Sequence, residues 1–341
     1  MKVLLYTQNF GFARGVAYYA RAYVKSLLKL GYEVTVLCYG GLDKEEPEFD
    51  LPIKKIYTND FWQVDKEFFK SILDEIKPDY CMFFEYDQWK ENKDNLIETC
   101  WENDVKPIAA WIAWEKLFDY MVPKFKRFHK IFVPTKGQTK VFRKFGLTNS
   151  YYIPFGLDLE EFKGEHKKLN EQIIFLHNKG YDDTEFDRKN TKVVIDAYEL
   201  IKDENTKLLL NSQRVEELSY EEIKRLYRGV DCFVFPSKYE GFGIPIIESI
   251  ISGTPVITTN YLPMNELVEE NKTGLLVDAY EYKETENIGV AQQIIDPKDL
   301  AIKMDMIKNN VVRELLYKGC ERLKNRFDYS NMVETLKKEL E

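Results

Sequence analysis

The stretch from Asp231 to Glu248 constrains the fold more than any other part of the chain. It begins with an apolar run, Cys232 to Phe235, which predicts a buried β-strand ending before Pro236. A glycine-containing turn follows, Glu240-Gly-Phe-Gly, and the apolar pattern from Ile244 predicts a helix. A strand, a glycine turn and a helix N-terminus together form an anion-binding site, because unpaired backbone N–H groups and the helix dipole converge there.

Two carboxylates accompany this turn: Glu240 lies within it, and Glu248 lies in the predicted helix. Carboxylates repel a phosphate but accept hydrogen bonds from hydroxyl groups. The expected ligand therefore offers hydroxyls to the glutamates and negative charge to the N–H groups, as a sugar nucleotide does. The simpler alternative is a strand-to-helix turn whose glutamate only favours the helix dipole.

The segment from Asp231 to Val277 resembles the donor-binding half of the family 4 glycosyltransferases. The resemblance rests on the Glu-x7-Glu pair, on Glu-Gly-Phe-Gly-Ile-Pro, and on the runs SGTPVITTN and ELVEENKTGLLV that follow. It implies an α/β protein with the GT-B fold, in which two Rossmann-like, doubly wound parallel-sheet domains face a central cleft. It also implies a retaining hexosyltransferase that uses a UDP- or GDP-linked sugar as co-substrate, with no obligatory cofactor or metal.

The composition is that of a globular protein with room for two domains. The 341 residues carry a net charge of −8, which argues against general nucleic-acid binding. Five scattered cysteines predict buried thiols in a reducing compartment, and three histidines show no metal-binding spacing. No apolar run approaches the roughly 20 residues that span a bilayer, and the start of the chain is too short and strand-like for a leader, so we expect a cytoplasmic protein.

Predicted strands and helices alternate along the chain, which is typical of doubly wound α/β domains. We expect an N-terminal, acceptor-side domain over residues 1–155 and a C-terminal, donor-binding domain over 156–328. Tyr151–Asp158 resembles the family's interdomain linker, with Phe155 where Asn is usual. The resemblance further implies that helix 329–341 packs back on the first domain. Ala279–Gln293 is expected to be a polar loop.

The first loop of the chain contains Gly11 and Gly15 but lacks Gly-x-Gly-x-x-Gly spacing, so a dinucleotide fingerprint is not supported. In the resembled family this loop lies over the donor diphosphate and sugar, where these glycines would provide room and N–H donors. Ordinary turn glycines are the alternative.

Arg188 and Lys189 precede a predicted helix that begins near Val193. Cations at a helix N-terminus oppose the helix dipole, and a bound diphosphate would remove this conflict. The family uses an Arg and a Lys from this region to bind the diphosphate, although it usually separates them in sequence.

Trp111–Glu115 is expected to end a strand, where open α/β sheets bind ligands. Many family 4 enzymes place a sugar-binding histidine here. This chain has none, and some relatives carry an aromatic-Glu pair resembling Trp114-Glu115. Glu115 is therefore a candidate contact to the sugar or acceptor, or simply a charge at the start of the next helix.

Residues 116–144 contain nine Lys or Arg and one acid, interleaved with aromatic residues. Such a segment can contact anionic lipid at the membrane's inner face or a phosphorylated acceptor. The alternative is a solvated helix whose aromatics face the core.

The chain is thus expected to transfer a sugar, with retention, to a glycan, lipid-linked or protein acceptor. The alternatives are a binding subunit with reduced catalysis and a sugar-nucleotide epimerase. The expected catalytic residues are Glu240, Arg188, Lys189 and Glu115. The expected donor-binding residues are Gly11, Gly15, Arg188, Lys189, Glu240, Gly241, Phe242, Gly243, Ile244 and Glu248.

Overall fold

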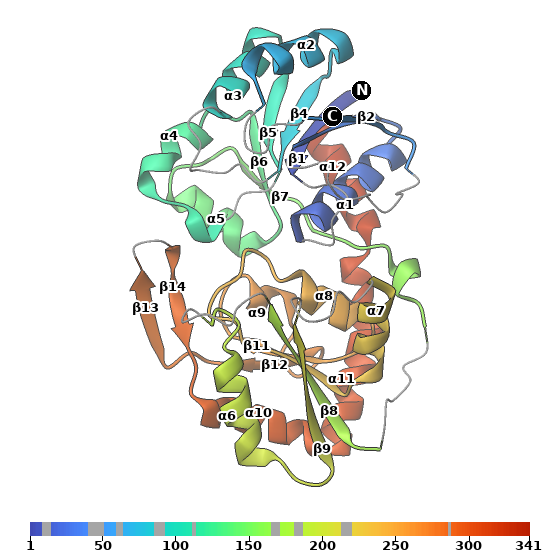
Figure 1. Ribbon diagram of the computed structural model, residues 1–341, viewed down its shortest axis with the longest axis vertical. Coiled ribbons are helices and arrows are strands. Elements are labelled where there is room, and N and C mark those ends of the chain that lie inside the picture. Colours follow the sequence, from blue (N-terminus) through green and yellow to red (C-terminus); the bar gives the residue numbers. More distant parts are fainter. Residues whose placement is uncertain are drawn as a thin grey trace. The chain divides into compact units, whose positions relative to one another are not determined.

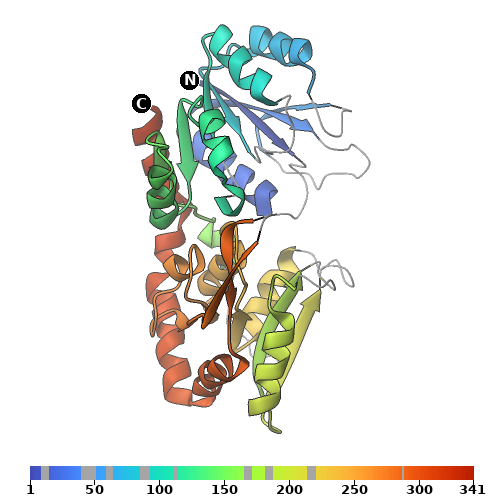
Figure 2. The same ribbon diagram turned by 90° about the vertical axis from the view of Figure 1, so that its left-hand side faces the viewer.

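The computed structural model describes residues 1–8, 15–39, 51–58, 64–84, 93–110, 114–164, 171–180, 187–212, 220–285 and 288–341. The chain forms two compact units (Figure 1). Unit 1 comprises Met1–Leu157 and Tyr329–Glu341, and unit 2 comprises Asp158–Asp328. The division falls close to the boundary expected after residue 155. Figures 1 and 2 show helices on both faces of the sheet in each unit, as in doubly wound folds.

Unit 1 is built on a seven-stranded parallel sheet with the order β3-β2-β1-β4-β5-β6-β7. The strands are β1 (Lys2–Gln8), β2 (Glu33–Tyr39), β3 (Lys54–Tyr57), β4 (Tyr80–Phe83), β5 (Lys106–Ala109), β6 (Lys130–Val133) and β7 (Ser150–Tyr152). Central strands such as β4 are buried along their whole length, because helices cover both faces. The strand order reverses between β1 and β4.

The helices of unit 1 are α1 (Gly15–Lys29), α2 (Lys66–Ile76), α3 (Lys93–Glu102), α4 (Val122–Phe125), α5 (Lys136–Lys144) and α12 (Tyr329–Leu340), with 3-10 turns η1 (Trp114–Lys116) and η2 (Asp119–Met121). Helix α12 comes from the far end of the chain and contacts α1. It buries Met332, Leu336 and Leu340, and the Tyr80 hydroxyl donates to the Leu340 carbonyl at 2.7 Å. The C-terminal helix is therefore an integral part of unit 1.

Unit 2 is built on a five-stranded parallel sheet with the order β12-β11-β10-β8-β9. Its elements are η3 (Leu159–Phe162), β8 (Ile173–Gly180), α6 (Thr191–Ile201), β9 (Thr206–Ser212), α7 (Tyr220–Gly229), β10 (Cys232–Phe235), α8 (Ile244–Ile251), β11 (Val256–Thr259), α9 (Met264–Leu267), β12 (Gly274–Val277), α10 (Pro297–Lys308), α11 (Asn310–Leu323) and η4 (Lys324–Phe327). The order reverses between β8 and β10. Ligands of such sheets bind beyond the carboxyl ends of the strands at this switch point.

One hydrophobic cluster of unit 2 packs between the sheet and helices α6 and α10. At the other end of β10, the buried Asp231 carboxylate accepts from the Ile174 N–H at 2.8 Å and the Tyr317 hydroxyl at 3.1 Å. A further ion pair joins it to Arg313 at 3.4 Å. These contacts fix the amino end of β10 against β8 and α11.

Two expectations from the sequence are wrong. Strand β5 ends at Ala109, and Trp114–Lys116 forms a 3-10 turn rather than the end of that strand; Trp111 lies outside the described residues. Ala279–Gln293 is not a loop but contains most of a hairpin, β13 (Glu281–Thr285) and β14 (Ile288–Ile294). Its polar composition hid the cross-strand pairing that stabilises it.

All five cysteines are buried and free, which confirms the buried-thiol prediction. Within the described ranges, the helices are too short or too polar to cross a bilayer.

Candidate functional site

The loops that follow β8 and β10 meet at the switch point of unit 2. The Lys238 N–H donates to the Arg188 carbonyl at 2.9 Å, and the Asn190 side-chain amide donates to the Pro236 carbonyl at 2.7 Å. Asn190 adopts a left-handed backbone with φ of 56°, which asparagine tolerates better than most residues. These contacts bring the segment containing Arg188 and Lys189 against the segment that leads to Glu240.

The three predicted charged residues form one cluster. The Arg188 Nη1 lies 2.9 Å from Glu240 Oε2, and the Lys189 Nζ lies 2.5 Å from Glu240 Oε1. The Lys189 ammonium also lies 4.1 Å from the centre of the Phe235 ring. The side chains of Lys189 and Glu240 are about one-tenth exposed, whereas that of Arg188 is one-third exposed. Arg188 is thus the member of the cluster most accessible to a ligand.

Burial raises the pKa of Glu240, but the charges of Lys189 and Arg188 outweigh burial and hold this pKa at about 2. Burial lowers the pKa of Lys189 to about 8, although the Glu240 charge opposes this effect. At neutral pH all three side chains are therefore charged, and the cluster carries a net charge of +1. This excess positive charge favours an anionic ligand.

The N-terminus of α6 is capped by a residue that the sequence reading did not select. The Asp187 carboxylate accepts from the N–H groups of Thr191 and Lys192 at 2.8 and 2.9 Å. An acid at this position satisfies the helix dipole. The predicted conflict between the two cations and the dipole is therefore relieved within the protein, by Asp187 at the helix and by Glu240 at the cations.

His177 is a second residue that the sequence reading missed. It is fully buried on β8, with Nδ1 at 2.8 Å from the Val234 carbonyl and Nε2 at 3.0 Å from the Thr191 hydroxyl. A carbonyl can only accept, so Nδ1 carries the proton and Nε2 accepts from Thr191. Burial lowers the pKa of His177 to about 4, which keeps the ring neutral. The ring therefore links β8, β10 and α6 beneath the cluster. Its partners Val234 and Thr191 are distant in sequence, so no local sequence pattern signals the structural role of His177.

The glycine turn has the predicted form. Helix α8 begins at Ile244 with Pro245 in its first turn, and Gly243 precedes it with φ of 105°. The positive φ would strain any other residue at Gly243, and a Cβ there would lie in tight contact with Ile246 at 3.2 Å and Leu267 at 3.3 Å. Phe242 and Ile244 are buried, and Gly241 is half-buried.

Glu248 lies in α8 and is 7% exposed. The pKa of the Tyr227 hydroxyl is raised first by the burial of Tyr227 itself and second by the negative charge of Glu248. That hydroxyl accepts from Asn178 at 3.2 Å, and Asn178 in turn accepts from Asn211 at 3.1 Å. Glu248 is thus next to a polar network at the carboxyl ends of β8 and β9. Whether it binds a ribose stays a prediction.

The predicted residues of unit 1 are less fully described. Gly11 lies outside the described residues, and Gly15 is the first residue of α1 rather than part of a loop. Glu115 is half-buried in the turn η1. The roles predicted for these three residues stay untested by the geometry.

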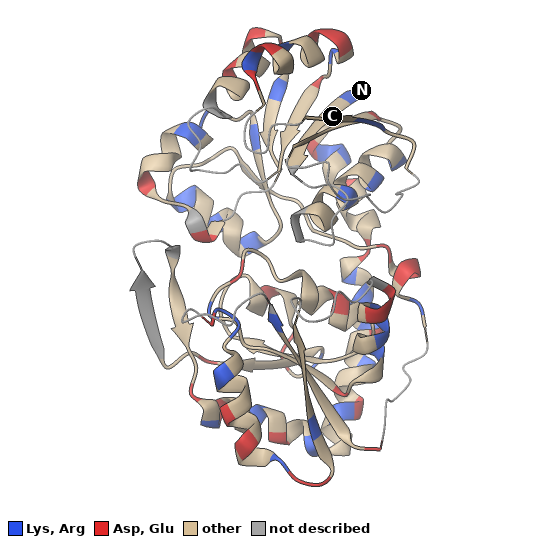
Figure 3. Ribbon diagram, viewed as in Figure 1, with Lys and Arg blue, Asp and Glu red and all other residues tan. Residues whose placement is uncertain are grey.

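In the basic segment 116–144 of unit 1, some aromatic side chains are buried in the core and other side chains are exposed. Phe125, Phe128 and Phe132 are buried, as the core alternative predicts, whereas Tyr120 is 62% exposed. Residues 120–157 contain eight Lys or Arg and no Asp or Glu. In contrast, acidic and basic residues are interspersed over the helices of unit 2 (Figure 3). Lys140, Arg143 and Lys144 are exposed on α5.

Metal-binding clusters of three or more His, Cys, Asp or Glu are not found among the residues that the structure describes.

Comparison with solved structures identifies the architecture. A glycosyltransferase from Rickettsia africae superposes with a TM-score of 0.72 at 14% identity, over 99% of this chain and 97% of that one. HepE of Anabaena, solved with UDP and glucose, superposes with a TM-score of 0.70 at 14% identity, over 100% and 99%. The fold is GT-B. In this GT-B protein, unit 2 contains the Arg188–Lys189–Glu240 cluster.

Sequence comparisons match part of the chain to glycosyltransferases. Residues 204–302 match the family model described as glycosyl transferases group 1. The capsular polysaccharide biosynthesis glycosyltransferase CapM of Staphylococcus aureus is 27% identical over 208 residues, 53% of this chain. The O-antigen chain mannosyltransferase B of Escherichia coli is 41% identical over 58 residues, 17% of this chain. The matches span only 51% and 15% of these relatives' own lengths.

Proposed function

We propose that the protein is a glycosyltransferase that moves a hexose from a nucleotide-sugar donor to a glycan, lipid-linked or protein acceptor with retention of configuration. The observation that carries the proposal is the single Glu240 carboxylate held between Arg188 and Lys189 at the switch point of a GT-B unit. The matches to bacterial polysaccharide glycosyltransferases support it.

The cluster has the charges that a sugar diphosphate requires. Arg188 can bind one phosphate with two parallel N–H groups, and Lys189 can act as a point charge on the other. A bound diphosphate would then replace Glu240 as the partner of the cations. The released carboxylate would accept hydrogen bonds from hydroxyls of the transferred sugar.

The same groups would stabilise the reaction. Departure of the nucleoside diphosphate places negative charge on the phosphate, and preorganised cations and backbone N–H groups lower the energy of that state. We propose that the leaving phosphate takes the acceptor's proton on the face where the new bond forms, so that no protein nucleophile participates. Glu248 would bind the ribose hydroxyls, while Gly241, Phe242, Gly243 and Ile244 would face the diphosphate. In unit 1, Gly11 and Gly15 would border the donor and Glu115 the sugar or acceptor.

The base is proposed to be uracil or guanine. HepE, which was solved with UDP and glucose, favours UDP as the first donor to test. Transfer should be measured with radiolabelled UDP- and GDP-sugars and candidate acceptors, in the wild type and in Glu240→Gln. The proposal is supported if the wild type transfers the sugar or slowly hydrolyses the donor. Glu240→Gln should then lower this turnover far more than it lowers nucleotide affinity. Inversion at C2 would instead indicate an epimerase, and binding without turnover a partner subunit.

For a lipid-linked acceptor we propose peripheral contact with anionic lipid through residues 116–144. The exposed cations of α5 and the exposed Tyr120 support this contact. Co-sedimentation with vesicles that contain an anionic phospholipid tests it, with vesicles of neutral phospholipid as the control. Equal binding to both kinds of vesicle, or to neither, would contradict it.

A further inference from the structure

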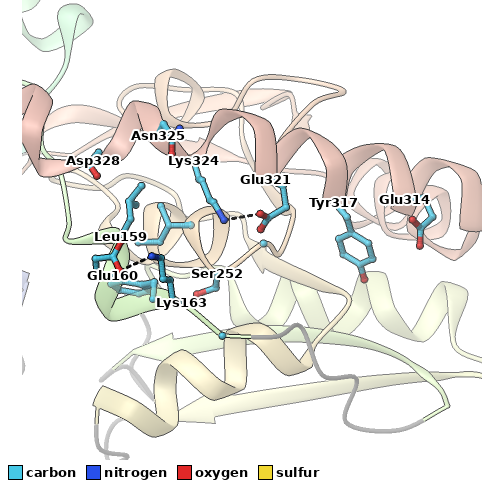
Figure 4. Close-up of a pocket in the computed structure, with 14 residues that line it drawn as sticks. Leu159, Glu160, Lys163, Ser252, Glu314, Tyr317, Glu321, Lys324, Asn325 and Asp328 are labelled. Atoms are coloured by element: carbon cyan, nitrogen blue, oxygen red, sulfur yellow. Dashed lines mark hydrogen bonds and ion pairs between the residues drawn. The ribbon is translucent and has the colours of Figure 1, made fainter.

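A cavity lies within unit 2, away from the charged cluster (Figure 4). Its volume is about 690 Å³, which is within the usual range for small-molecule sites. Ile251, Ser252 and Gly253 line it at the C-terminal end of α8, whereas Glu240 precedes the N-terminal end of that helix. The eight residues of α8 separate the two places by about 12 Å.

The charged walls of the cavity are neutralised in pairs. Lys163 lies 2.6 Å from Glu160, and Lys324 lies 2.6 Å from Glu321. Figure 4 shows both pairs among the lining residues. The remaining lining includes the exposed Glu314 and the apolar Leu159 and Phe162. An anion such as phosphate would meet an excess of carboxylates, whereas hydroxyl groups can donate to carboxylates and accept from ammonium groups.

Ser252 adds an unsatisfied polar group to this lining. It is 6% exposed, and its hydroxyl oxygen has no hydrogen-bond partner within the described part of the chain. A buried polar atom without a partner is costly, which favours a ligand that supplies one. The neighbouring Gly253 has φ of 87°, and a Cβ there would lie 3.2 Å from a Glu321 carboxylate oxygen. Glycine therefore keeps the wall open beside Glu321.

The cavity is also lined by both segments that join the units. Leu159 to Gly164 follow the passage of the chain into unit 2, and Asn325 and Asp328 precede its return to unit 1. The two passages are adjacent, because the Tyr329 N–H donates to the Leu157 carbonyl at 3.1 Å. A molecule in the cavity would therefore contact both passages at once.

We propose that this cavity is a second ligand site, which binds a neutral carbohydrate and is separate from the donor site. The paired charges and the Ser252 hydroxyl recognise its hydroxyl groups, while Leu159 and Phe162 contact its apolar face. Occupancy reduces the mobility of the two joining segments.

The test is binding of unlabelled mono- and disaccharides to the full chain without nucleotide, by saturation-transfer NMR and calorimetry. Glu321→Gln and Ser252→Ala should each weaken binding, and the double variant should weaken it at least about tenfold. Lys318→Gln on the same helix, outside the lining, is the matched surface control. Glu240→Gln should bind saccharide normally, so failure of the donor-site proposal would leave this result unaffected.

Amide hydrogen exchange supplies a second readout: saccharide should increase protection in 158–164 and 324–329 together. The proposal is overturned if no saccharide binds, if binding survives in both lining variants, or if inorganic phosphate or spermidine binds in place of a sugar. Melting temperatures of the variants establish that each one is folded.

Discussion

At the scale of single residues, Glu240 acts as an internal counter-ion. Its carboxylate occupies the charges of Arg188 and Lys189 that a diphosphate would use. A buried carboxylate is tolerated there because both cations are within hydrogen-bond distance. Any anionic ligand must therefore compete with Glu240 for the two cations.

Arg188→Ala should weaken binding of a nucleoside diphosphate by about 1.5–3 kcal/mol, the range for a hydrogen bond to a charged group. Calorimetry with UDP and GDP measures the change. Lys192→Ala is the matched control, since Lys192 is exposed on α6 and paired with Asp196. Unchanged affinity in Arg188→Ala would remove this residue from the site.

Binding of a nucleoside diphosphate should also weaken as the pH rises through about 8. Lys189 has a pKa of about 8 in the free protein, so above this pH the ammonium loses its proton and its charge. Lys189→Arg should bind with little pH dependence over the same range, because arginine stays protonated. Calorimetry at pH values on either side of 8 measures the affinity of the wild type and of Lys189→Arg. If both affinities change with pH in the same way, the deprotonation of Lys189 does not cause the weakening.

At the scale of elements, His177 joins two strands and a helix beneath the cluster. Its pKa is about 4 in the folded protein against 6.5 ordinarily, so the unfolded chain binds more protons between these values. Stability conferred by the neutral ring is therefore complete above about pH 6.5 and is lost as the pH falls towards 4, by about 3 kcal/mol. Hydrogen exchange of β10 amides measures this loss. His177→Gln should not show this loss of stability between pH 6.5 and 4. If the stability of the variant falls with pH as steeply as that of the wild type, His177 is not the cause of the loss.

Local sequence patterns were sufficient for β10 and α8. The run Cys232–Phe235 is bounded by Pro236, and Gly243 and Pro245 define the start of the helix, so these elements form as predicted. Patterns of this kind could not reveal contacts between distant residues. Arg188, Lys189 and Glu240 were selected for different parts of a donor, but their mutual pairing depends on two loops that only the sheet order brings together.

The hairpin β13–β14 and the Asp187 cap were missed for related reasons. Strand β13 is short and polar, so it shows no apolar alternation of its own, and it pairs with β14, as Lys283 does with Gln292. The end of β14 is also held by a residue outside the hairpin, since the Gln293 N–H donates to the Lys238 carbonyl at 3.0 Å. The Asp187 cap was missed because α6 begins at Thr191, two residues before the start that the apolar pattern at Val193 predicts.

At the scale of the molecule, the two units can be followed separately. All five tryptophans precede residue 158, so selectively excited tryptophan fluorescence originates in unit 1. Leu336 is fully buried in α12, which is separated in sequence from the rest of unit 1 by unit 2. The stability of unit 1 therefore depends on the last helix of the chain.

Leu336→Ala should destabilise unit 1 by about 2–5 kcal/mol, the usual cost of such a truncation in a core. Urea unfolding followed by tryptophan fluorescence measures this change. Binding of a nucleoside diphosphate below the unfolding transition should be unchanged, because the charged cluster belongs to unit 2. An unaltered midpoint would show that α12 contributes little to the unit.

The hydrogen bond between Tyr329 and Leu157 has a practical consequence for engineering. Because the polypeptide departs from unit 1 and rejoins it at neighbouring points, Asp158–Asp328 is in effect a cassette inserted into a continuous host. Exchanging this cassette with that of a GT-B homologue needs only two adjacent splice junctions. Chimaeras made in this way would separate the contribution of each half to substrate choice.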